Sequence, residues 1–297
     1  MEPVYIWLYN HSHSYVLFRM IIWGSAIWLL LRTFRRLQVN MDVAIAFFSM
    51  ASLIWFSYAR VSLSFALMFF GLALISTKSK TLFSNIFGLL LVWASFYFHK
   101  SAPFGMAIVL FSLVISIVRS KYVPVLLLLF VIVAISIYTQ NIGGLFESFT
   151  EVDNESLSNY ASAGSYYVGD NEGSRLSLFA AAGLLRVIEV LVFVLDAILS
   201  MMLIMRYGDK EMPYSIRCFT LSVLLIFVTS AVIGIASNEF LGTVHIRLLR
   251  FCIIPAIVVF TYSYQNGYFR KFCSFLFYFC CLSSFAHVLY SWYCTIG

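Results

Sequence analysis

The chain has 297 residues, of which 62% are hydrophobic and 11% are charged, with a formal net charge of +6 and a mean hydropathy of +0.93. Because a soluble domain carries roughly 25% charged residues, this composition excludes a soluble globular protein and indicates an integral membrane protein. The apolar runs have the length of membrane helices and not the short alternating pattern of an outer-membrane barrel. We therefore predict an all-α, polytopic helix bundle that forms a single domain over residues 1–297.

Apolar runs separated by charged residues predict about ten membrane-spanning helices. In chain order these spans cover 14–31, 41–58, 61–76, 81–98, 102–118, 121–138, 176–205, 218–235, 247–265 and 272–293. The segment 139–175 is too rich in Gly, Ser and Asn for a buried element, so we expect one long loop there. The opening stretch MEPVYIWLYNHSHSY is acidic and aromatic and does not have the order of a cleavable signal peptide.

The basic residues predict the orientation of the spans. Because Lys and Arg accumulate in cytoplasmic loops, we assign to the cytoplasm the loops that hold Arg32, Arg35, Arg36, Lys78, Lys80, Arg119, Lys121, Arg206, Lys210, Arg217, Arg270 and Lys271. The opposite, outer face receives the loop 139–175 and five scattered cations, Arg60, Lys100, Arg175, Arg247 and Arg250. The positive charge of the chain thus reflects topology and calls for no nucleic-acid partner.

Two polar residues stand at the predicted outer ends of early spans. Arg60, in FSYARVSLSFAL, either marks a helix end by extending its guanidinium to the interface or serves a function. In FYFHKSAPFG, Ser101 and Pro103 are typical of a helix start, and Lys100 is expected on the surface. His99 lacks such an explanation, and it is either a solvated loop residue or a functional side chain.

A second pair of cations opens a late span. VHIRLLRFCIIP places Arg247 and Arg250 three residues apart, on one face of a helix. Two such cations repel each other unless an anion lies between them. An acid such as Glu239, or one from the long loop, is the structural explanation. A bound phosphate is the functional explanation, which we favour because planar guanidinium groups bind phosphate oxygens in pairs.

The loop 139–175 carries Tyr160, Tyr166 and Tyr167 among Asn, Asp and Ser residues. Loops of this length in compact proteins are usually functional or disordered. Tyrosine rings that stack on sugars, with polar neighbours that bind hydroxyls, would suit carbohydrate recognition. Merely solvated tyrosines are the alternative.

The span GLLRVIEVLVFVLDAIL holds three charged residues, of which Arg186 and Glu189 are spaced to pair within one helix. Asp196 falls near the bilayer centre, where a carboxylate needs a partner or a cavity. A protonated Asp196 in an interhelical hydrogen bond explains it structurally. A proton-coupled transporter would instead use such an acid directly.

No metal or cofactor site is expected. The cysteines show neither CxxC nor histidines at ligand spacing, and we interpret them as apolar filler: Cys218, Cys252, Cys273, Cys280, Cys281 and Cys294. The sequence also contains no phosphate-binding P-loop, HExxH zinc motif or serine nucleophile elbow.

The order of the outer-face residues resembles a known family. An arginine at a span start (YARVSLSFAL), a histidine ending a later span (FYFHKSA), a long outward loop and an arginine opening a late span (IRLLRFCIIP) are similar to the EpsG-like and Wzy-type polymerases of O-antigen and exopolysaccharide assembly. The similarity extends over roughly residues 2–270. It implies a multi-pass protein of the bacterial inner membrane whose active site faces the periplasm.

The resemblance also implies a substrate, an undecaprenyl-pyrophosphate-linked oligosaccharide, and a reaction in lipopolysaccharide or polysaccharide biosynthesis. The growing glycan would be transferred from its lipid carrier to the terminal sugar of a new lipid-linked repeat unit. By similarity, Arg60 and Arg247 match the pyrophosphate-facing arginines and His99 matches the outer-face histidine. We add Arg250 from helix geometry and the three loop tyrosines as substrate-binding candidates. Membrane lipids and a chain-length regulator protein are the expected partners.

Three other functions remain open from the sequence. A transporter or flippase of lipid-linked oligosaccharides would make Asp196 and Arg186 central and leave His99 incidental. A structural subunit of an export complex would depend on no single outer-face residue. A ligase that joins the glycan to another acceptor would use the same arginines.

Overall fold

The computed structural model describes residues 3–12, 14–55, 59–77, 81–99, 102–118, 181–208, 212–236 and 248–296, together with residues 120, 122, 126, 129 and 133. Within these residues every regular element is a helix, so the predicted all-α class is confirmed for this part of the chain. The predicted loop 139–175 and nearly all of the predicted span 121–138 lie outside the described residues.

The helices follow the predicted apolar runs closely. They are α1 (Pro3–His11), α2 (Tyr15–Arg36), α3 (Met41–Trp55), α4 (Ala59–Ser76), α5 (Leu82–Ala94), α6 (Ala102–Ile117), α10 (Ala181–Tyr207), α11 (Tyr214–Ala236), α13 (Ile253–Gln265) and α14 (Arg270–Ile296), with the short 3-10 helices η1 (Ser95–Tyr97) and η3 (Arg250–Cys252). Every predicted span except 121–138 contains one of the long helices. The short helix α1 was not predicted.

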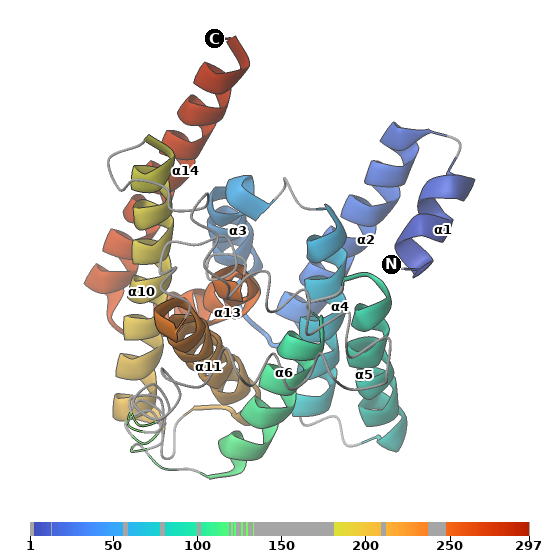
Figure 1. Cartoon of the computed structure of the whole chain (residues 1–297). Helices are drawn as coiled ribbons and strands as arrows, with labels where there is room; N and C mark the ends of the chain where they lie inside the picture. Colours follow the sequence, from blue (N-terminus) through green and yellow to red (C-terminus); the bar gives the residue numbers. More distant parts are fainter. Residues whose placement is uncertain are drawn as a thin grey trace.

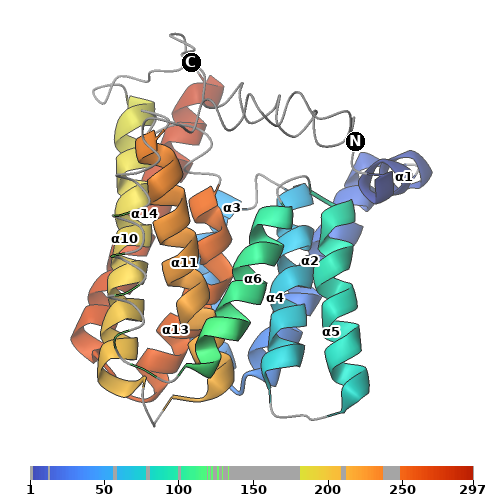
Figure 2. The same ribbon diagram turned by 60° about the horizontal axis from the view of Figure 1, so that its bottom comes forward.

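Long helices joined by short connections run in opposite directions, and α10 runs in the same direction as α6 (Figures 1 and 2). The starts of α4, α6 and α10 and the ends of α3, α5 and α14 therefore meet at one end of the bundle, where α1 also lies (Figures 1 and 2). We call this the site end and the opposite one the basic end. The basic end holds the cations that close α2 and open α14, among them Arg35, Arg36 and Arg270.

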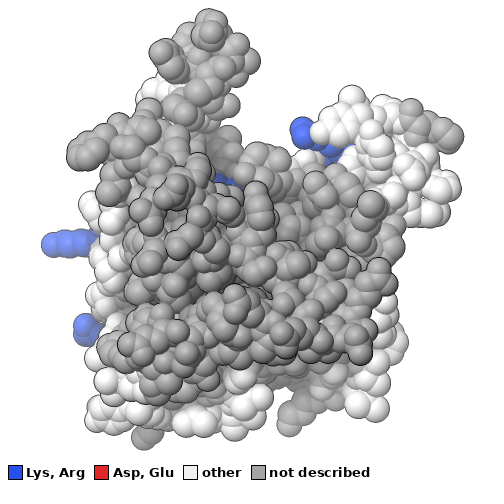
Figure 3. Space-filling view, viewed as in Figure 1, with Lys and Arg blue, Asp and Glu red and all other residues white. Residues whose placement is uncertain are grey.

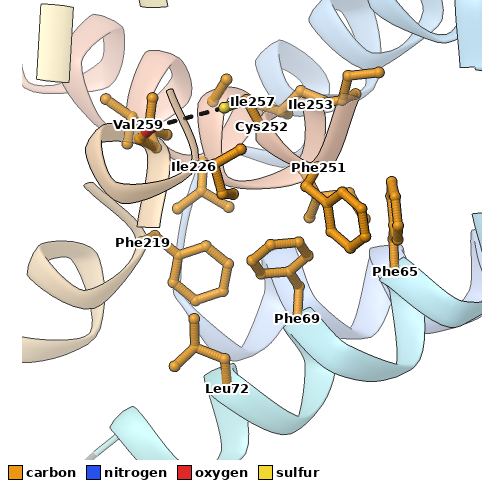
Figure 4. Packing of buried hydrophobic residues seen from close by; sticks show 14 of the residues in the cluster. Phe65, Phe69, Leu72, Phe219, Ile226, Phe251, Cys252, Ile253, Ile257 and Val259 are labelled. Carbon is orange, nitrogen blue, oxygen red and sulfur yellow. Dashed lines mark hydrogen bonds between the residues drawn. The ribbon is translucent and has the colours of Figure 1, made fainter. Parts of the chain in front are cut away.

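The core is formed by helices that other helices surround. All eleven residues Ile253–Ser263 of α13 are buried, and most of α11 is buried as well. Figure 4 shows α4, α11 and the η3 region meeting through Phe65, Phe69, Phe219 and Phe251. Four of the cysteines fit the predicted role of apolar filler, because those at 218, 252, 273 and 280 are free and buried.

Four described helices are long and apolar enough to cross a membrane: α2, α11, the part Val187–Tyr207 of α10 and the part Arg270–Leu289 of α14. The helices α3, α4, α5 and α6 are apolar but shorter. Large apolar side chains such as Phe83, Phe111 and Tyr278 point outward, and the described surface in Figure 3 is mainly uncharged. These features support a membrane protein, whereas the total of ten spans stays a prediction.

Candidate functional site

Three segments that carry predicted site residues meet at the site end through phenylalanine rings. The ring centroid of Phe251, in η3, lies 3.9 Å from that of Phe65 in α4 and 5.6 Å from that of Phe104 in α6. Phe65 comes five residues after Arg60, Phe104 comes five after His99, and Phe251 directly follows Arg250. Because five helical residues span about 7.5 Å, this cluster brings the three backbone segments close together.

A hydrogen bond fixes the segment of His99 to that of Arg60. Ser64 Oγ, in the first turns of α4, donates to the backbone carbonyl of Ser95 in η1 at 3.0 Å. The His99 carbonyl in turn accepts from the Ala102 N–H at 3.0 Å, where α6 begins. His99 itself is half-buried. The segment 95–99 is thus held beside the start of α4.

Several predicted site residues lie where the structure does not describe them. Arg247 and the tyrosines at 160, 166 and 167 are outside the described residues, and so is the side chain of Arg60, although its backbone belongs to α4. Their roles stay predictions. Of the predicted set, the side chains of His99 and Arg250 are described.

Arg250 makes a two-point ion pair with Glu189 of α10. Its Nε lies 2.7 Å from Glu189 Oε1 and its Nη2 lies 3.2 Å from Oε2. The side chains are 14% and 2% exposed, respectively. An acid therefore neutralises Arg250, as the structural explanation required, and among the described residues this acid is Glu189. Glu239 and the long loop lie outside the described residues. Phosphate binding by Arg250 stays a prediction.

His287 of α14 completes this group, and the sequence reasoning missed it. Its Nε2 lies 3.9 Å from Glu189 Oε2, and its side chain is 23% exposed. The signal was present in the sequence: Ser283, Ser284 and His287 recur at helical spacing in an apolar span. Glu189 had been assigned to Arg186, whose side chain is outside the described residues.

A small pocket lies one to two turns deeper between α3, α10, α13 and α14. It has room for water but not for a sugar ring, and it is lined by Phe47, Glu189, Val192, Phe193, Asp196, Ile253, Ala256, Cys280, Ser283 and Ser284. Asp196 is 4% exposed. Within the described structure, its Oδ1 and the Ser283 Oγ have no hydrogen-bond partner. The interhelical hydrogen bond expected of Asp196 is therefore not made by Oδ1.

The charged pair at this end is Arg250 with Glu189, and His287 lies beside it; anion binding here stays a prediction. Arg250 supplies a fixed positive charge, and Glu189 orients its guanidinium through two hydrogen bonds. Among the described residues, no three His, Cys, Asp or Glu side chains are grouped as metal ligands. Metal independence of the reaction stays a prediction.

Comparison with known proteins shows a family match. The family model described as the EpsG family matches residues 1–295. Neither the curated proteins nor the solved structures yield a match to this chain. The family match covers the helices described above, apart from the last residue of α14.

Proposed function

Since the chain belongs to the EpsG family, which indicates a polysaccharide polymerase-like role, we propose that it transfers a growing glycan from undecaprenyl pyrophosphate to the terminal sugar of a new lipid-linked repeat unit. The reaction would take place at the site end, facing the periplasm. The observation that supports this best is the convergence of the Arg60, His99 and Arg250 segments around Phe251.

The reaction requires few catalytic groups. The anomeric carbon of the donor already bears a pyrophosphate leaving group, whose charge grows as the glycosidic bond to it breaks. Fixed cations at that position stabilise the transition state more than the ground state. Arg60, Arg247 and Arg250 are proposed for this role, without a metal ion.

His99 is proposed as the group that faces the acceptor. A neutral imidazole can accept the proton of the attacking sugar hydroxyl. The hydroxyl oxygen then bonds to the anomeric carbon while the bond to pyrophosphate breaks on the opposite side. Such an in-line attack inverts the anomeric centre.

Single substitutions in cells test the proposal. In a strain that lacks its own polymerase, His99→Ala and Arg247→Ala are expected to abolish the ladder of long glycans, with a loss of at least about 100-fold. Arg19→Ala is a matched control, because Arg19 is an exposed arginine near the same end that lies over the Tyr15 ring. Wild-type ladders from both site variants, at wild-type protein levels, would contradict the assignment.

A transporter of lipid-linked oligosaccharides is the second candidate. It is favoured by one observation, the buried Asp196 whose Oδ1 has no hydrogen-bond partner in the described structure. An Asp196→Asn variant separates the two functions, since asparagine cannot carry a proton across the membrane but keeps the shape of the carboxyl group. The polymerase predicts an intact glycan ladder from this variant, whereas a proton-coupled transporter predicts its loss.

A further inference from the structure

Glu189 lies at the centre of a charged group to which three elements contribute. Arg250 of η3 reaches both of its oxygens, and His287 of α14 approaches Oε2 to 3.9 Å. Its side chain is only 2% exposed. A carboxylate buried so deeply in a membrane protein is costly without a positive partner. Whatever draws Arg250 away from Glu189 must therefore be accompanied by a replacement.

We propose that Glu189 and His287 are positioning residues for Arg250. Glu189 holds the guanidinium while the site is empty, and protonated His287 takes over Glu189 when Arg250 turns to the pyrophosphate of the donor. The inference rests on the proposed function, because the anion that Arg250 would bind is the donor pyrophosphate of that reaction. It adds two residues, on α10 and α14, that were not among the predicted site residues.

The geometry of His287 fits a replacement partner. The distance of 3.9 Å between its Nε2 and Glu189 Oε2 exceeds a hydrogen bond, and a small rotation of either side chain closes it. Nε2 is buried and has no hydrogen-bond partner in the described structure, so no described group competes for it. Arg250 is the more exposed member of the ion pair, with 14% of its side chain accessible against 2% for Glu189.

Among the described residues, few other charges act on His287. The described charged groups that face it are Glu189 and Arg250, and Asp196 lies two turns deeper along α10. The other helices packed against α14 contribute Phe47 from α3 and Ile253 and Ala256 from α13 to the neighbouring pocket. Of the described charges, those of Glu189 and Arg250 are therefore the ones that respond to the charge of His287.

The exchange predicts how donor binding depends on pH. At low pH His287 is protonated and can hold Glu189, so Arg250 is available to the donor. As pH rises, His287 loses its proton, Glu189 retains Arg250, and donor affinity falls. The pyrophosphate of a lipid-linked sugar is a diester that stays ionised throughout, so the change comes from the protein.

Kinetics of the purified full-length protein test the exchange, with the lipid-linked repeat unit that accumulates in a polymerase-deficient strain as donor. For the wild type, the donor KM should rise about tenfold between about pH 6 and about pH 8. His287→Ala should show the high KM at both pH values, with kcat changed less than about twofold. His287→Lys supplies a permanent cation and should restore the low KM at both.

Two further variants complete the design. Ser283→Ala, one turn away on the same helix, should keep the wild-type KM and its pH dependence. Glu189→Gln removes the acid that competes for Arg250, so its KM should no longer depend on pH. If His287→Ala does not fold, Glu189→Gln and His287→Lys still test whether Glu189 exchanges Arg250 for His287.

The outcomes separate the inference from the proposed function. If the wild type lengthens the glycan but His287→Ala or Glu189→Gln keeps the wild-type pH dependence of KM, the exchange is wrong and the polymerase stands. If the wild type does not lengthen lipid-linked repeat units at all, the proposed function itself fails.

Discussion

At the scale of single residues, Arg217 shows how a basic residue serves both topology and packing. Its side chain is 1% exposed. Its guanidinium donates to the Gly208 carbonyl, to the Val118 carbonyl at 2.7 Å and to the Ser120 carbonyl at 3.1 Å. These carbonyls follow the ends of α10 and α6, where positive charge stabilises a helix. Arg217, which the sequence assigns to a cytoplasmic loop, is therefore a buried residue that caps two helices.

Arg217→Lys should destabilise the protein by about 3 kcal/mol, because an ammonium group cannot reach three carbonyls and leaves buried acceptors unpaired. Thermal unfolding of the detergent-purified protein measures the effect. Arg35→Lys, an exposed arginine in the last turn of α2, is the control and should change stability by less than about 0.5 kcal/mol. Equal effects of the two substitutions would contradict the capping role.

The Glu189–Arg250 pair shows what could not be predicted from the sequence at this scale. The repulsion between Arg247 and Arg250 predicted an acid near Arg250. Polar residues within apolar spans could also be recognised from the sequence. That Glu189 is this acid could not be predicted from the sequence. The two residues are 61 positions apart along the chain, and their pairing depends on how α10 packs against η3. The pairing is a property of the assembled bundle.

At the scale of elements, α4 and α5 pack closely because both carry a glycine at their contact. A Cβ on Gly71 would lie 2.5 Å from the Gly88 carbonyl oxygen, and a Cβ on Gly88 would lie 2.9 Å from that of Gly71. Small residues allow such close approach between membrane helices. The contact matters for the site, because α4 and α5 lead to Arg60 and His99 at their site ends.

Gly71→Ala should cost about 2 kcal/mol, because the methyl group meets backbone atoms that cannot move aside easily. Gly24→Ala is the matched control: no atom lies within 4 Å of its added Cβ, and alanine favours a helix by up to about 1 kcal/mol over glycine. Unfolding in a denaturant series would measure both. A stabilising Gly71→Ala would show that α4 and α5 do not approach as described.

The helices themselves were largely predictable from the sequence. The predicted spans 41–58, 102–118 and 218–235 correspond to Met41–Trp55, Ala102–Ile117 and Tyr214–Ala236, since long apolar runs end where polar residues begin. The 3-10 segments η1 and η3 were not predicted, because they arise where helices adapt to neighbouring side chains. The short α1 was missed because nine residues are too few for a span.

At the scale of the whole molecule, the distribution of basic residues predicted which helix ends lie together. The structure places the starts of α4, α6 and α10 at one end (Figure 2), as the alternation of loops required. Which of the two ends faces the periplasm stays a prediction, because it depends on the membrane and not on the fold. The positive-inside rule assigns the basic end to the cytoplasm.

Labelling of single cysteines in intact cells should show this orientation. Ser14 and Thr81 are exposed N-cap residues of α2 and α5, without side-chain capping bonds, at the site end and the basic end respectively. A membrane-impermeant maleimide should label Ser14→Cys after the outer membrane is permeabilised, and it should label Thr81→Cys only in lysed cells. The unchanged chain gives the background of the native cysteines, and the reverse pattern would place the site end in the cytoplasm.

Lengthening of lipid-linked repeat units by the purified protein tests the central claim most directly. The measurement uses the full chain in lipid nanodiscs, with EDTA present and no ion gradient, and resolves glycan length by electrophoresis. We expect a ladder of lengthened glycans from the wild type and from Asp196→Asn, and none from Arg247→Ala. Repeat units that keep their original length with folded wild-type protein would contradict a metal-independent polymerase.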